Sequence, residues 1–157
     1  MAELENLTRT DSVRARLEGV QLAALSNAIV GLHRRYYGRG ATRARCYQPH
    51  DDLVLVEMRD AYITVEHTLL ARGQEDAVRS ARLTFQQAMS AEFIGAVEEI
   101  THRKVQAYRS ESFASPEVVL EIFYLEPSSA VQARLERERA EDAGEIDRPT
   151  GGNPDAD

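Results

Sequence analysis

Residues 43–59 read RARCYQPHDDLVLVEMR, and this stretch predicts a β-hairpin at the centre of the fold. In the first predicted strand, residues 43–48, arginine and tyrosine alternate with alanine and cysteine, which indicates one solvated face. The second predicted strand, residues 53–59, is apolar on both faces until Glu57 and therefore favours a more central position. The residues between the strands, 49–52, are Pro-His-Asp-Asp and suit a tight turn.

A long amphipathic helix is predicted before the hairpin, over residues 12–37. Thr10 or Asp11 can cap its start, and Gly38 can adopt the left-handed conformation that closes a helix. Two apolar stripes at helical spacing make it apolar around much of its girth, so we expect a sheet or a partner chain to cover it. The stripes are Val13, Leu17, Val20, Ala24 and Ala28, and Leu22, Leu25, Ile29, Leu32 and Tyr36.

The remaining elements give the order helix, hairpin, helices, hairpin, and the fold class α+β, with two main helices packed on two β-hairpins. After the first hairpin the sequence predicts a short helix at 65–71 with Thr64 as its cap, a long helix at 75–101, and strands at 104–109 and 118–125. We predict one domain over residues 12–127 and a charged tail over 128–157, helical at 129–143 and disordered from residue 144.

Composition and net charge limit the kinds of protein that this chain can be. The chain has 157 residues, of which 43% are hydrophobic and 29% charged, typical of one globular domain. Its net charge of -7 argues against nucleic acid as a partner, and no apolar run is long enough for insertion into a membrane. The start of the chain lacks the features of a secretory signal, and a lone cysteine, Cys46, forms no internal disulfide. We therefore expect a cytoplasmic protein.

The sharpest candidate for a binding site is the basic run over residues 33–45, which contains no acid. Guanidinium groups and glycine amides can hold phosphate, carboxylate or bicarbonate. Cations also gather at a helix C-terminus and on a solvated strand without any ligand, and we favour that interpretation. The long helix can add two arginines at i and i+3, although pairing with Glu75 or Asp76 on a solvated face explains them better. The candidate anion-binding residues are Arg34, Arg35, Arg39, Arg43, Arg45, Arg79 and Arg82.

No catalytic, metal or cofactor site is predicted. Cys46 is better explained as a small buried strand residue than as a nucleophile. The pair Glu66 and His67, like Glu98, Glu99 and His102, lacks the spacing that makes a metal site specific. A further pair of acids, Glu57 and Glu121, interrupts apolar strands and suits either acid-base chemistry or pairing with the nearby Arg59 and Arg109.

Three segments carry a family resemblance: Ser26-Asn27-Ala28-Ile29-Val30, Asp52-Leu53-Val54-Leu55-Val56, and the junction from Val97 to Val105, VEEITHRKV. Over residues 13–127 the chain resembles the MpsC-like family of small bacterial domains. That family is named for component C of a sodium-translocating, membrane-potential-generating system. The chain departs from similar sequences at His102, where they tend to carry glycine, and this difference bears on how the long helix ends.

The resemblance implies association with a membrane system linked to sodium or inorganic-carbon transport and supplies no catalytic signature. We therefore expect a non-enzymatic accessory or regulatory domain that works through protein contacts, as a homo-oligomer, most simply a dimer, with transporter subunits as possible partners. The alternative is a sensor of small anions (phosphate, bicarbonate or a nucleotide) that uses the basic patch between Arg34 and Arg45.

Overall fold

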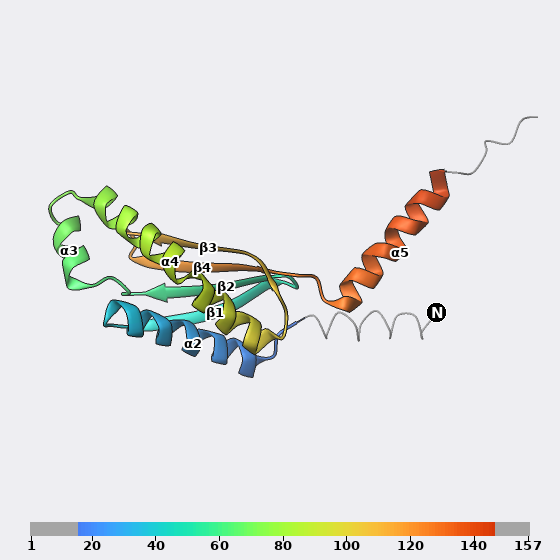
Figure 1. The fold of residues 1–157 in the computed structure, drawn as a ribbon, viewed down its shortest axis with the longest axis horizontal. Coiled ribbons are helices and arrows are strands. Elements are labelled where there is room, and N and C mark those ends of the chain that lie inside the picture. Colours follow the sequence, from blue (N-terminus) through green and yellow to red (C-terminus); the bar gives the residue numbers. More distant parts are fainter. Residues whose placement is uncertain (1–15, 147–157) are drawn as a thin grey trace, which may run out of the picture.

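A computed structural model describes residues 16–146, which form one α+β domain followed by a projecting helix (Figure 1). The predicted fold class is confirmed. In chain order the elements are α2 (Gly19–Tyr37), β1 (Arg43–His50), β2 (Leu53–Arg59), α3 (Thr64–Leu70), α4 (Glu75–Thr101), β3 (Val105–Phe113), β4 (Val118–Leu125) and α5 (Ser129–Ile146).

The two hairpins form a single antiparallel sheet with the strand order β1-β2-β4-β3. The more apolar strand of each hairpin, β2 and β4, lies in the centre, as the sequence indicated for β2, and these two strands pair with each other. The charged strands β1 and β3 are the edges. Edge strands are buried less than central ones, so the order follows from how apolar each strand is.

Helices α2 and α4 pack side by side on one face of the sheet. Along β2, the side chains of Val54, Val56 and Met58 are fully buried under these helices, whereas the alternate residues are only partly buried. From the helices, Leu25 and Ile29 of α2 meet this face. Phe93 and Val97 of α4 complete the core. Burial of this kind contributes about 25 cal/mol per Å² of apolar surface. The other face of the sheet carries no helix within residues 16–146.

Helix α2 begins later than predicted, at Gly19 rather than at residue 12. Glu18 precedes it in extended backbone conformation, and the backbone N–H of Glu18 donates to Oε1 of Gln21 at 3.0 Å. This contact sets the helix start. The caps proposed at residues 10 and 11 lie outside the described residues. Gly38 ends the helix with φ 75°, as predicted, a conformation that glycine adopts without steric cost.

Helix α4 has the predicted bounds, and His102 ends it in the left-handed conformation at φ 55°. Histidine therefore occupies a position that favours glycine. The short helix α3 spans Thr64–Leu70, so Thr64 is its first helical residue and not its cap. The cap position belongs to Ile63, whose backbone N–H donates to Oε2 of Glu66 at 2.8 Å.

Helix α5 projects away from the domain (Figure 1). It extends three residues beyond the predicted end at residue 143. Most of its described side chains are exposed, in keeping with a mostly solvated helix. The disorder expected from residue 144 is wrong for residues 144–146, which are helical, and otherwise concerns residues 147–157, which lie outside the described part.

Candidate interaction surface

The face of the sheet that carries no helix, here called the open face, has an apolar centre. Cross-strand pairing places its side chains in rows that run from β1 through β2 and β4 to β3. The open face consists of Arg43, Arg45 and Tyr47 from β1, Leu53, Leu55, Glu57 and Arg59 from β2, Val118, Leu120, Ile122 and Tyr124 from β4, and Ala107, Arg109, Glu111 and Phe113 from β3.

Large apolar side chains on this face remain in contact with solvent. Three aromatic side chains are the most exposed, Tyr47 at 40%, Phe113 at 48% and Tyr124 at 46%. Between them, Leu55 and Ile122 are only partly buried, because no element of the described chain lies over them. A contiguous apolar patch with a polar rim is typical of protein interaction sites.

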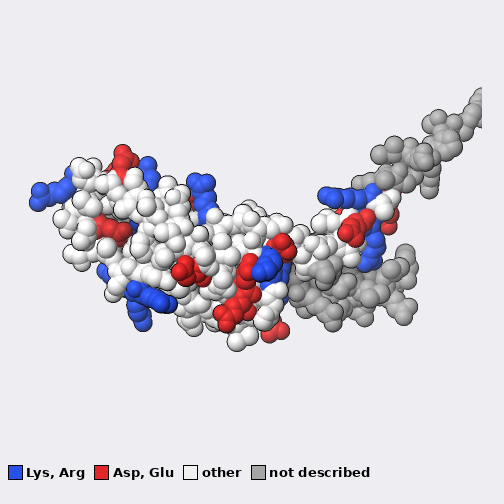
Figure 2. Space-filling view, in the orientation of Figure 1, with Lys and Arg blue, Asp and Glu red and all other residues white. Residues whose placement is uncertain are grey.

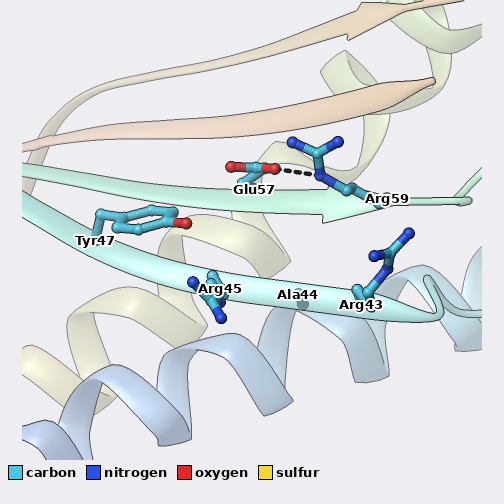
Figure 3. A pocket seen from close by; sticks show the side chains of 6 residues that line it. All are labelled: Arg43, Ala44, Arg45, Tyr47, Glu57 and Arg59. Carbon is cyan, nitrogen blue, oxygen red and sulfur yellow. Dashed lines mark hydrogen bonds and ion pairs between the residues drawn. The ribbon is translucent and has the colours of Figure 1, made fainter. Parts of the chain in front are cut away.

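A basic pocket lies at the β1 side of the open face and has a volume of about 220 Å³. Figure 3 shows Arg43 and Arg59 at one end of it, Tyr47 at the other, and Arg45 with Glu57 between them. Nε of Arg59 donates to Oε1 of Glu57 at 2.6 Å. Arg43 lies 3.9 Å from the Asp60 carboxylate, and Arg45 makes no ion pair with any residue that the structure describes. The pocket therefore has room for a further carboxylate or similar anion.

The other predicted anion-binding residues do not join this pocket. Arg34 lines a separate pocket of about 320 Å³ with Asn27 and Thr42, and Arg35 lies against the ring of Tyr36. Arg39 is exposed just beyond the end of α2. Figure 2 shows Lys and Arg interspersed with Asp and Glu on the side in view. The basic run is thus divided among several surfaces.

Arg79 and Arg82 differ from each other in environment. Arg79 is exposed and pairs with Asp76 at 3.3 Å, as expected from helix spacing. The same expectation was wrong for Arg82, which is 1% exposed. Its Nε and Nη2 donate to the two carboxylate oxygens of Glu66 at 2.6 and 2.7 Å, and Nη2 also donates to the Ala61 carbonyl at 3.1 Å.

Tyrosine rings pack against this buried guanidinium. Its central carbon lies 4.0 Å from the ring centroid of Tyr62 and 5.0 Å from that of Tyr37. A charge buried in this way is stabilised by a two-point ion pair and by cation–π contact. Arg82 therefore anchors α4 to α3, and its charge is neutralised within the chain.

A second buried polar cluster joins α2 to the sheet. His33 was expected among the solvated cations at the end of α2, but it is 1% exposed, and its Nε2 lies 2.9 Å from Oε1 of Glu121. The hydroxyl of Tyr108 donates to Oε2 of the same carboxylate at 2.7 Å. The pKa of Tyr108 is raised, first by burial and then by the charge of Glu121. The only sequence signal for this cluster was an acid inside an apolar strand.

A groove of about 500 Å³ lies between α4 and β3. Arg79 and Arg82 from α4 and Arg109 from β3 line it, together with Gln86 and Ser110, whose side chains hydrogen-bond to each other. The groove is therefore mixed in character. Its arginines already pair with Asp76, Glu66 and Glu111.

The residues that the sequence offered for catalysis, Cys46, Glu57 and Glu121, lie in different environments. Burial raises the pKa of the Cys46 thiol to about 12, which keeps it protonated and weakly nucleophilic at neutral pH. The two acids considered for acid-base chemistry lie on opposite faces of the sheet, Glu57 on the open face and Glu121 under the helices. No group of three or more potential metal ligands occurs among residues 16–146. No helix in that same range is long and apolar enough to cross a membrane.

Comparison with protein-family models matches residues 18–127 to the Na+-translocating membrane potential-generating system (MpsC). The match begins at the residue before α2 and ends just after β4, so it covers the α+β domain and leaves out α5. No curated protein and no solved structure shows significant similarity to the chain. The family model covers most of the chain, and the chain therefore belongs to the MpsC family.

Proposed function

We propose that this chain is a non-enzymatic accessory component of a membrane-potential-generating transport system and works through protein contacts, as a homo-oligomer in the cytoplasm. The family supports its place in such a system. The observation that carries the proposed mode of action is the open face, where Leu55, Ile122 and Tyr124 remain in contact with solvent. A surface of this kind gains free energy when a partner covers it.

The electrostatics of the domain agree with this proposal. On the helix-covered face, the buried charges of Arg82 and Glu121 have partners within the chain. On the open face, Arg45 has no ion-pair partner among the described residues. Charged side chains around an apolar centre are suited to selecting a partner.

Photocrosslinking in cells tests the proposal. A photoreactive amino acid replaces Ile122 on the open face or, as a matched control, Leu83, which is 53% exposed on α4. We expect adducts from position 122 with a second copy or with a membrane subunit of the same system, and few or none from position 83. A clean monomer by light scattering, without adducts from either position, contradicts the proposal.

A second candidate function, sensing of a small anion, is favoured by the basic pocket with Arg43, Arg45 and Arg59 around a single carboxylate. A thermal-shift screen with phosphate, bicarbonate and nucleotides tests it. An anion at 100 times its dissociation constant stabilises the chain by about 2.7 kcal/mol. We expect Arg45→Gln to abolish the shift, and no shift with any of these anions contradicts this function.

A further inference from the structure

The charges of the open face are arranged so that the face is complementary to itself. In one row, Arg45 on edge strand β1 aligns through Glu57 and Leu120 with Glu111 on edge strand β3. The row therefore begins with a cation at one edge of the sheet and ends with an anion at the other. Glu111 is half-exposed, and within its own chain it contacts only the adjacent Arg109 among the described charges.

We infer that the open face binds a second copy of this chain, in an isologous dimer whose two-fold axis runs parallel to the strands, between β2 and β4. This inference rests on the proposed function and names its partner. A rotation about that axis exchanges the two edges of the sheet and keeps each position along the strands. Arg45 of one chain then lies over the second copy's Glu111, and the reverse contact forms at the other edge.

The neighbouring rows fit the same arrangement. One row begins with Tyr47 on β1 and ends with Arg109 on β3, so the rotation stacks an aromatic ring under a guanidinium. The other row begins with Arg43 and ends with Phe113, which gives the same kind of pair with the roles reversed. All three rows thus place an arginine at one edge against an anion or an aromatic ring at the other.

Electrostatics distinguishes this axis from the alternative. A two-fold axis perpendicular to the strands places β1 over β1, so that the arginines of one chain, Arg43 and Arg45, face those of the other. Like charges placed opposite each other cost free energy, so that stacking is disfavoured. The axis parallel to the strands also buries apolar side chains near the centre, because Leu55 of one chain lies over the second copy's Ile122 and the reverse contact forms beside it. In the next row, Leu120 lies over the second copy's Glu57, whose carboxylate already accepts from Arg59 in its own chain.

The known geometry of stacked sheets is compatible with these contacts. Two sheets packed face to face cross at about 30°, and an edge strand of a four-stranded sheet lies about 7 Å from the central axis. The crossing therefore displaces opposed edge residues by about 4 Å, a distance that arginine and glutamate side chains can span. Apolar side chains in the middle, close to the axis, are displaced least.

A charge exchange in the full chain tests the inference, with the dimer dissociation constant measured by sedimentation equilibrium at low salt. We expect Arg45→Glu and Glu111→Arg each to weaken the dimer by about tenfold or more, because each change makes two contacts repulsive. The double variant, Arg45→Glu with Glu111→Arg, should restore the dissociation constant to within about threefold of the original, since both contacts are attractive again. Arg79→Glu, on exposed α4, is the matched control and should leave it unchanged.

Other results overturn the inference. If neither single variant changes the dimer dissociation constant, the dimer uses another face. If each single variant weakens the dimer but the double variant does not restore it, the axis parallel to the strands is excluded. A monomer at all concentrations also overturns it, whereas adducts with a membrane subunit in the crosslinking experiment would still support the accessory role. If the dimer shows the expected charge dependence but never crosslinks to such a subunit, the inference stands and the proposed association with a membrane subunit is contradicted.

Discussion

The two faces of the sheet use charge in opposite ways. Under the helices, Glu121 is fully buried and both of its carboxylate oxygens have partners, His33 and Tyr108. On the open face, Arg45 has no ion-pair partner among the described residues, although it lies within the same four-stranded sheet. A buried charge requires a hydrogen-bond or ion-pair partner, whereas water solvates an exposed charge, which therefore needs no partner in the protein. Charges on the covered face therefore hold the fold together, whereas on the open face an arginine can remain without an ion-pair partner at little cost.

Removal of a buried charge should give the largest effect. Arg82→Met leaves the Glu66 carboxylate buried without its two-point partner, and we expect a loss of about 3–5 kcal/mol in the free energy of unfolding, measured by urea denaturation. Arg79→Met, which breaks an exposed pair on the same helix, should cost at most about 0.5 kcal/mol. Equal losses in the two variants would contradict the assignment of Arg82 as a structural anchor.

A matched pair of tyrosines compares the faces directly. Tyr108→Phe removes the hydroxyl that donates to Glu121, and we expect a loss of about 1–3 kcal/mol because one oxygen of a buried carboxylate becomes unpaired. Tyr124→Phe removes a hydroxyl from a side chain that is 46% exposed and should change the stability by less than about 0.5 kcal/mol. Denaturation at a concentration that keeps the chain monomeric measures both values.

Alkaline pH should disrupt the covered face. Burial raises the pKa of Tyr37 from 10.0 to about 12, and burial also raises the pKa of Tyr108. Because the pKa of Tyr37 is higher in the folded than in the unfolded state, the contribution of its neutral hydroxyl to the free energy of unfolding is complete below pH 10 and is lost as pH rises toward 12. The pKa of Tyr108 is raised in the same direction and adds to the loss. Near-UV circular dichroism measured against pH should show unfolding in this window. In Tyr37→Phe, the free energy of unfolding should fall less steeply with pH. An unchanged slope in that variant would contradict the role of Tyr37.

The sequence predicts the elements of this fold better than their contacts. Local patterns were sufficient for β2, α4 and β4, because each is long or continuously apolar and has a clear end signal close by, such as Gly73 before α4 or Pro127 after β4. The strand order was left open because pairing between β2 and β4 joins residues 59 to 71 positions apart, and periodicity contains no information on such pairs.

The buried clusters were missed for the same reason. His33 and Glu121 are separated by 88 residues. His33 was therefore placed among the cations at a helix end, and Arg109 was the partner considered for Glu121. Arg82 and Glu66 lie 16 residues apart on different helices, so helix spacing predicted the wrong partner. By contrast, the placement of Arg43 and Arg45 on one solvated face followed from the two-residue period of a strand, and the structure confirms it.

A small expected effect on the stability of the monomer is the most informative about the open face. Ile122 is only partly buried, so Ile122→Thr should cost the monomer about 1 kcal/mol or less, as no cavity forms and part of the side chain already contacts water. A folded monomer therefore has little need of isoleucine at this position, and any larger effect must come from a partner. If the open face is an interface, the same change should weaken association well beyond its effect on monomer stability, which sedimentation equilibrium and urea denaturation together measure. Losses of equal size in the two measurements would mean that Ile122 contributes to folding alone.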